Sequence, residues 1–450
     1  MLRYLTKFYL FSGILIFYLL FKNLDEVYLP IYIFNFLICL SFGSIILIQN
    51  SNPKKLFSKS NVLWIIFFYS IITIFLNNFI SYSYRENFFV FSESDAGTYD
   101  QLALAFNNKS SFIKGLDYLL ENYSYDDLGA VIVVSTLYNI FESNIILNVF
   151  YLFVGLITAS GIYNIAKNFL TVKNTYLCTL VYSISSYTIW FHSSGLKESF
   201  LVMLVVLAFS FYYNYWRDRK IVQLLYCAAM LVSIVFFRPA VSYLIIASIF
   251  LSLLLVSKFN FFTLLNLLII GVVLFFFFSS IVEQTNRFTL NADMGALIAS
   301  KESDNMIKGS VNFTYFVSLI SSFLGPFPTF VPNYKTHLSF FSAGLLYKVL
   351  LSVPFLTGIY FVIAKKIKIL FPILAFLLLE IFSLVLILEA LELRKSLPHF
   401  PFVFLIIFWM IDQFENKSVL NLHQRKVIIK MTYLSSFVLL GLVVYWNFRI

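Results

Sequence analysis

Three carboxylates lie close together in a chain that otherwise avoids charge. The segment FSESDAGTYDQLALAF, residues 91–106, contains Glu93, Asp95 and Asp100, whereas only 12% of all residues are charged. A carboxylate beside a reacting hydroxyl accepts its proton as the new bond forms, which is general-base catalysis. The alternative is structural: Asp95 only caps a helix, and Glu93 and Asp100 are solvated. The segment therefore predicts either a catalytic carboxylate or an ordinary helix start.

A short helix would position this carboxylate. Ser94 or Asp95 suits its first position, because either side chain can accept a hydrogen bond from a free backbone N–H. An apolar stripe follows at helical spacing, formed by Tyr99, Leu102, Ala103 and Phe106. We expect this helix to lie along a membrane surface with Asp95 at its leading end.

Basic residues at the starts of apolar segments supply the opposite charge. Lys197 opens one segment in WFHSSGLKESFLVML, and Arg238 precedes Pro239 in FFRPAVSYL. A third stretch, EALELRKSLPHFPF, holds Glu389, Glu392, Arg394, Lys395 and His399. Helix starts combined with Arg and Lys side chains bind phosphate, so we predict a phosphate site from Lys197, Arg238, Arg394, Lys395 and His399. The alternative is that these cations reach lipid headgroups and that His399, between two prolines, is a turn residue.

The composition defines the class of protein that holds these groups. Hydrophobic residues make up 60% of the 450-residue chain, which contains 55 Phe and 29 Tyr. That is the composition of an integral membrane protein. The net charge of +10 falls in short clusters between apolar runs, so nucleic acid is excluded as a partner. Cys39, Cys178 and Cys227 lie inside apolar runs without metal-ligand spacing and are expected to be packing residues.

The apolar runs predict an all-α polytopic membrane protein of about 13 transmembrane helices in a single domain over residues 1–450. The expected spans are 4–21, 28–48, 62–82, 144–165, 174–191, 199–215, 221–236, 240–256, 261–280, 343–363, 369–388, 400–412 and 428–447. The run 128–141 is too short, so we interpret it as a half-buried helix on the outer face.

The distribution of charge predicts the orientation. If the N-terminus is cytoplasmic, the inner loops contain 18 of the 32 basic residues but only 3 of the 22 acidic ones. The two long connections, 83–143 with the acidic motif and 281–342, then lie on the outer, periplasmic face.

Two further features lie near these connections. Pro326, Pro328 and Pro332 in FLGPFPTFVPNYKTH exclude a continuous helix, so this aromatic turn either forms the wall of a lipid or sugar site or is simply structural. Glu380 sits within a predicted span and must face the bundle or a water cavity, where Lys348 is one candidate partner.

The order of these motifs resembles a known group of enzymes. ESDAGTYDQLA, SNIILNVFYLFVGLITASGIYNIAKNFL and SSGLKESFLVMLVVLAFSFYYNY are similar to bacterial membrane glycosyltransferases of the GT-C type and to O-antigen and capsule repeat-unit polymerases. GPFP and RKSLPHFP resemble later landmarks of the same group. In that group an outer-loop aspartate is catalytic, which implies Asp95 here, with Glu93 as its helper.

The resemblance implies an activity in the bacterial inner membrane. A sugar or oligosaccharide carried on a polyprenyl phosphate or diphosphate would be transferred to an acceptor on the periplasmic face, together with other polysaccharide assembly proteins. The residues leave open whether Mg²⁺ or Mn²⁺ assists, since Glu93 and Asp95 alone do not form a coordination sphere. The alternative is a flippase for lipid-linked oligosaccharide, although transporters place their charges at the midplane rather than at one face.

Overall fold

The computed structural model describes residues 1–23, 28–51, 58–85, 95–122, 128–140, 144–256, 311–324, 327–330, 337–386, 393–416 and 420–448. Throughout this part of the chain the regular structure is helical. The predicted all-α fold is therefore confirmed. The predicted span 261–280, most of the connection 281–342, and Glu93 fall outside these residues.

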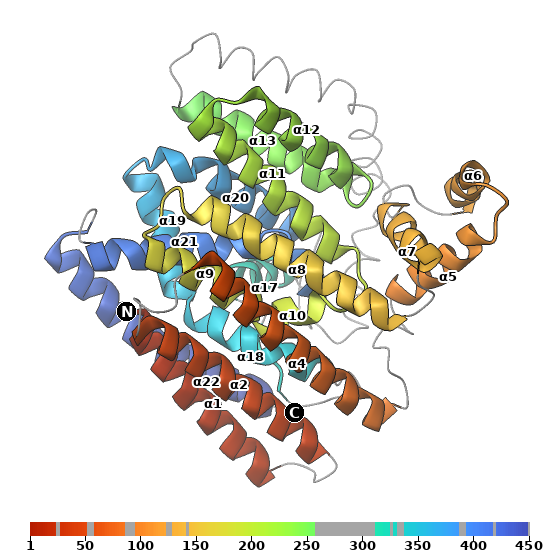
Figure 1. Ribbon diagram of the computed structural model, residues 1–450. Coiled ribbons are helices and arrows are strands. Elements are labelled where there is room, and N and C mark those ends of the chain that lie inside the picture. The colour runs from red at the N-terminus through yellow and green to blue at the C-terminus, as the bar shows by residue number, and fades with distance from the viewer. Residues whose placement is uncertain are drawn as a thin grey trace.

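Long helices form the body of the protein (Figure 1). On one side of the bundle lie α1 (Leu2–Asn23), α2 (Leu29–Ser51), α4 (Lys59–Arg85) and α22 (Leu422–Phe448). The middle contains α8 (Asn144–Ala166) and α11 (Glu198–Asp218), which pack against each other. Towards the other side lie α12 (Ile221–Val235), α13 (Pro239–Val256) and α20 (Phe371–Leu386), and α17 (Val311–Leu324) packs against α20.

Seven of the described helices are long and apolar enough to cross a membrane: α1, α2, α4, α8, α11, α20 with its preceding turn η3 (Lys368–Leu370), and α22. An eighth span is formed if α18 (His337–Leu350) and α19 (Ser352–Ala364), bent by 48° at their junction, count as one. The expected count of about 13 is not reached by this criterion, because α12, α13 and α21 (Phe400–Asn416) are shorter, the run 174–191 is broken, and 261–280 lies outside the described residues.

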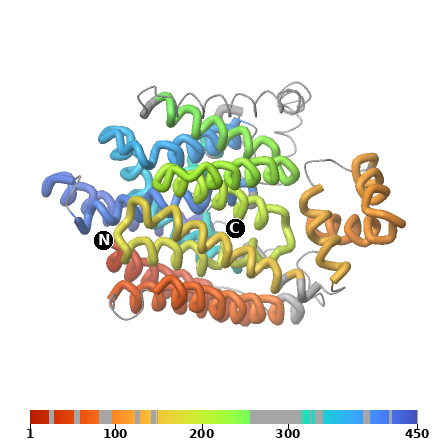
Figure 2. The backbone as a smooth tube through the Cα atoms, turned by 45° about the horizontal axis from the view of Figure 1, so that its top comes forward, coloured from red at the N-terminus to blue at the C-terminus, as the bar shows by residue number. Residues whose placement is uncertain are grey.

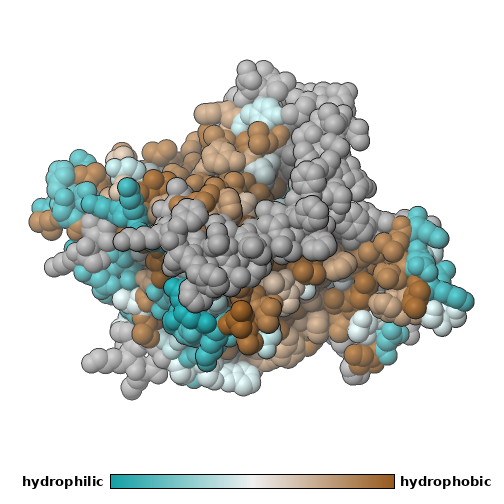
Figure 3. All heavy atoms as spheres, turned by 90° about the horizontal axis from the view of Figure 1, so that it is seen from above, coloured by the Kyte–Doolittle hydropathy of each residue, from teal (hydrophilic) through white to brown (hydrophobic). Residues whose placement is uncertain are grey.

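The outward faces of the long helices are apolar, as lipid requires. On α4, Trp64, Phe68, Ile72 and Phe75 are more than half exposed at helical spacing, while Ser70 and Thr73 are buried on the opposite face. Figure 3 shows hydrophilic residues in separate patches, one at the right edge over α5–α7 and others towards the left, with hydrophobic surface between them. This is the surface expected of a membrane protein.

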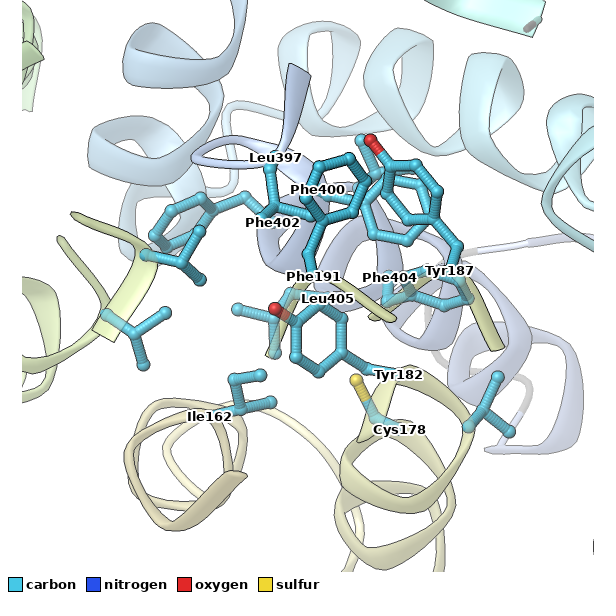
Figure 4. Close-up of a cluster of buried hydrophobic side chains, with 14 of the residues drawn as sticks. Ile162, Cys178, Tyr182, Tyr187, Phe191, Leu397, Phe400, Phe402, Phe404 and Leu405 are labelled. Carbon is cyan, nitrogen blue, oxygen red and sulfur yellow. The ribbon is translucent and has the colours of Figure 1, made fainter. Parts of the chain in front are cut away.

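The centre of the bundle is aromatic and almost fully enclosed. All of α21 from Phe400 to Phe414 is buried, and its Phe400 and Phe404 rings lie against Tyr182 (Figure 4). The Tyr187 ring packs on Phe400 at a centroid distance of 4.7 Å. Such ring pairs add stabilisation beyond their buried area.

One predicted span is broken at this centre. The run 174–191 forms α9 (Val172–Ile184) and α10 (Ser186–Phe191), separated by Ser185. Gly344 of α18 packs directly on the break, where its N–H donates to Ser186 Oγ at 3.0 Å. A Cβ on Gly344 would lie 2.1 Å from Ser185 Oγ, so this close approach requires glycine.

Charged residues predicted to share the inner side lie together. Lys173, Glu415 and Arg425 are within electrostatic range of the Met1 amino group, and Lys59, Arg217 and Asp218 are within range of Lys167. At this end the buried Asp412 of α21 caps α9. Its carboxylate accepts hydrogen bonds from Thr171 Oγ1 and Asn174 Nδ2, both at 2.5 Å.

We predict that Asp412→Ala destabilises the protein strongly and that Glu415→Ala does not. Asp412 is buried and satisfies the buried Asn174 amide, so its loss should cost about 1–3 kcal/mol. Glu415 lies one turn further along α21 in a part-exposed pair with Lys173 at 3.4 Å, which contributes about 0–1 kcal/mol. Unfolding of the detergent-purified variants measures the difference, and equal losses would show that Asp412 is not a structural cap.

Candidate functional site

A buried ion pair joins two helix starts inside the bundle. Glu198 is the first residue of α11, and Arg238 directly precedes Pro239, the first residue of α13. The Arg238 guanidinium lies 3.5 Å from Glu198 Oε1, and the two side chains are 17% and 2% exposed. Glu198 Oε2 has no hydrogen-bond partner among the described residues. A carboxylate in the first turn is stabilised by the helix dipole, and the buried charge is compensated by the guanidinium.

Two tyrosines, from α8 and α10, lie near the Glu198–Arg238 pair and connect it to neighbouring segments. Tyr151 of α8 donates its hydroxyl to the Gly195 carbonyl at 3.0 Å and lies within electrostatic range of Glu198. Tyr187 of α10 lies within the same range of Glu198, and its hydroxyl is 3.1 Å from Ser396 Oγ in η5 (Leu393–Ser396). The starts of α11 and α13 and the turn η5 therefore meet around what we call the Glu198 site, namely Glu198, Arg238, Tyr151, Tyr187 and Ser396.

The predicted cations lie at or beside this site. Lys197, the residue before α11, is buried to 9% exposure, and Arg238 forms the pair itself. Lys395 precedes Ser396 and is partly buried. Arg394 belongs to η5, but its side chain lies outside the described part of the structure. Lys197 and Arg238 therefore lie next to Glu198, and η5 is linked to it through the Tyr187–Ser396 contact.

His399 is placed differently from the prediction. Its Nδ1 lies 3.6 Å from Glu380 Oε2 of α20, and both side chains are at most 4% exposed. The predicted phosphate-binding imidazole is therefore directed to an internal carboxylate. Glu380 faces the bundle interior as expected, and the partner that the structure gives it is His399.

The acidic segment forms the expected helix. Asp95 is the first residue of α5 (Asp95–Asn107), and Ala96, Tyr99, Ala103 and Phe106 are buried. This apolar face packs against α6 (Phe112–Asn122) and α7 (Leu128–Ile140). The apolar face of α5 is thus covered by α6 and α7. The run 128–141 is helical as predicted.

Helices α5–α7 form a small group at one side of the bundle, visible in Figure 1 and in the turned view of Figure 2. Within the group Asn107 and Ser135 exchange two hydrogen bonds, and Tyr138 donates to Asp100. Burial and then the Asp100 charge raise the pKa of Tyr138, so its hydroxyl remains a donor at neutral pH.

This group is attached beside the Glu198 site. The Gly129 N–H donates to the Phe236 carbonyl at 2.9 Å, two residues before Arg238. Gly129 sits so close to the Phe237 ring that a Cβ would lie 2.6 Å from it. Tyr138 also lies within electrostatic range of Tyr151. Asp95 begins α5 of this same helical group, five residues before Asp100.

The aromatic proline turn is held by the C-terminal helix. Asn447 of α22 accepts from the Phe330 N–H at 2.6 Å and donates to the Pro328 carbonyl at 3.0 Å. Trp446 donates to Thr329 Oγ1 at 3.0 Å. Residues 327–330 therefore have the contacts of a structural turn, while Pro326 and Pro332 lie outside the described residues.

The chemistry available at the site is electrostatic and acid–base. Within the described ranges, no three His, Cys, Asp or Glu side chains are grouped so that they could hold a metal ion.

No protein-family model matches the chain, and the curated proteins contain no significant match to it. The assignment of a function must therefore come from the residues themselves.

Sequence reasoning missed Glu198 and the tyrosines. A signal for Glu198 existed, because a carboxylate inside the apolar run GLKESFLVML is as unusual as the neighbouring Lys197. Tyr151, Tyr187 and Tyr138 carried no such signal among 29 tyrosines.

We predict that Arg238→Met lowers stability by about 3–5 kcal/mol, because it leaves the buried Glu198 carboxylate without its ion-pair partner. Adding Glu198→Gln should recover most of this loss, since the amide carries no charge. A double-mutant cycle on denaturant unfolding in detergent measures the coupling. Additive losses would mean that the two groups do not act as a pair.

Proposed function

We propose that the protein is a membrane glycosyltransferase that uses a saccharide carried on a polyprenyl phosphate or diphosphate. More specifically, we propose a repeat-unit polymerase of surface polysaccharide such as O-antigen or capsule, in the bacterial inner membrane. The observation that carries this proposal is the Glu198–Arg238 pair, with Lys197 directly before Glu198 and with the helical group that begins with Asp95 attached to the α12–α13 turn. A carboxylate and several cations at one side of an apolar bundle suit a phosphate leaving group and a hydroxyl acceptor.

We propose the following roles for the residues. Asp95 takes the proton of the acceptor hydroxyl while that oxygen bonds to the anomeric carbon of the donor sugar. The bond from this carbon to the phosphate oxygen breaks, and its electron pair leaves with the lipid phosphate. Lys197 and Arg238 stabilise the developing negative charge, with Arg394 and Lys395 of η5 contributing from the other side.

Glu198 acts as a positioning residue in this scheme. Its carboxylate holds Arg238 at 3.5 Å and prevents the guanidinium from turning away from the site. The charges of Lys197, Arg238 and Glu198 sum to one formal positive charge at the helix starts. This net charge attracts a phosphate without binding it irreversibly.

We further propose that the N-terminus is cytoplasmic and that the chain crosses the membrane about 13 times. The shorter helices α9–α10, α12, α13 and α21 and the run 261–280 would complete the count. Two clusters of charge support the orientation: one around Met1 and Lys173, the other around Lys59 and Lys167. Helices α5–α7 would then lie on the periplasmic side.

A flippase for lipid-linked oligosaccharide is the second candidate. The observation that favours it is the Glu380–His399 pair, because paired ionisable groups inside a bundle are typical of ion-coupled transporters. Apart from this pair and the buried Lys348, most described charges of the long helices lie towards helix ends, which favours the transferase.

We predict that Asp95→Asn abolishes long-chain polysaccharide in cells while the protein remains inserted and folded. The amide keeps the size of the side chain but cannot accept the acceptor proton, so a loss of at least about 100-fold is expected. Polysaccharide length on gels measures the outcome.

Asp117→Asn is the matched control, since Asp117 is an exposed carboxylate of α6 in the same helical group. It should leave chain length unchanged. Normal chains in the Asp95→Asn strain, at normal protein levels, would remove Asp95 from the mechanism.

A further inference from the structure

A second polar cluster lies near the start of the segment that joins α10 to α11. His192 follows α10 and faces α8, where a Cβ on Gly155 would lie 3.3 Å from its ring. Gly155 thus makes room for the imidazole. The residues around His192 come from α4, α8, α9 and α10 and enclose a cavity of ≈ 10 Å³, which is about the space of one water molecule.

The polar side chains in this cavity lack partners. Ser183, Thr188 and His192 are at most 6% exposed. The hydroxyls of Ser183 and Thr188 and both ring nitrogens of His192 make no hydrogen bond to any residue that the structure describes. A buried hydroxyl without a partner costs free energy, and buried polar groups of this kind are normally satisfied by ordered water or a ligand.

The chemistry of the lining defines the ligand. Its polar members are Ser70, Ser183, Thr188 and His192, and the remainder is apolar, including Phe67 and Leu152. The lining contains no Lys, Arg, Asp or Glu, so neither an anion nor a cation would be compensated there. A neutral imidazole offers one donor and one acceptor, and each hydroxyl can do both. This set suits a group that donates and accepts hydrogen bonds without charge.

The position of the cavity explains how such a ligand could arrive. Helix α4 forms the outer wall of the cavity. Only 22% of its apolar segment is buried inside the protein, compared with 50% for α8. The exposed face of α4 is apolar, so an amphiphile in the bilayer has direct contact with this wall.

We propose that the cavity between α4, α8, α9 and α10 is a binding site for a single uncharged hydroxyl group, supplied by water or by the head of a membrane alcohol. The proposal rests on the unpartnered polar atoms and the enclosed space, and it does not depend on glycosyl transfer.

The sign of a stability change tests it. Thr188→Val and Ser183→Ala remove hydroxyls that would hold the ligand, so both should lower the unfolding midpoint of the purified full-length protein, each by about 1–2 °C. The matched control is Thr158→Val in α8, whose buried hydroxyl donates to the Val154 carbonyl at 2.8 Å. Midpoints for Thr188→Val and Ser183→Ala equal to or above that of the wild type would overturn the proposal, because removing an unsatisfied hydroxyl from a dry cavity stabilises the protein.

Added 1-decanol and decane identify the source of the hydroxyl. A midpoint raised by decanol alone, in the wild type but not in Thr188→Val, assigns the site to a membrane alcohol. If decanol and decane change the unfolding midpoint equally, while Thr188→Val and Ser183→Ala lower it as expected, the hydroxyl is supplied by water.

Discussion

The arrangement of the site depends on one buried ion pair. Glu198 and Arg238 begin two different helices, α11 and α13, and their contact at 3.5 Å fixes these helix starts relative to each other. A carboxylate that is 2% exposed needs a cation nearby, so the pair constrains the α12–α13 turn as well. That turn provides the Phe236 carbonyl on which Gly129 docks. The same contact therefore determines where α5–α7 attach.

This arrangement connects stability with the proposed chemistry. The groups that would hold a phosphate are fixed by helix starts, which are rigid, rather than by mobile loops. The carboxylate proposed as the base lies on a separate helical group joined through the Gly129–Phe236 hydrogen bond, and Tyr138 of this group, which donates to Asp100, lies within electrostatic range of Tyr151. A donor lipid and an acceptor can then approach from different sides, as a transfer between two large substrates requires.

The sequence predicted the helices well and their packing poorly. Hydrophobic runs located most described helices, and Asp95 and Pro239 marked helix starts correctly, because caps and prolines act locally. The break at Ser185 was not predictable, since it depends on Gly344 from a distant helix. His399 was assigned to phosphate because its neighbours are basic, yet its environment is set by Glu380 from another element. Side-chain partners across helices leave no trace in a single sequence.

The most direct test is to reconstitute the purified protein in vesicles with a lipid-linked oligosaccharide and measure the length of the glycan and its side of the membrane. The account predicts that glycans are joined into longer chains on their lipid carrier without added nucleotide sugar. Movement of the lipid-linked oligosaccharide across the bilayer with its length unchanged would contradict the account and identify a flippase.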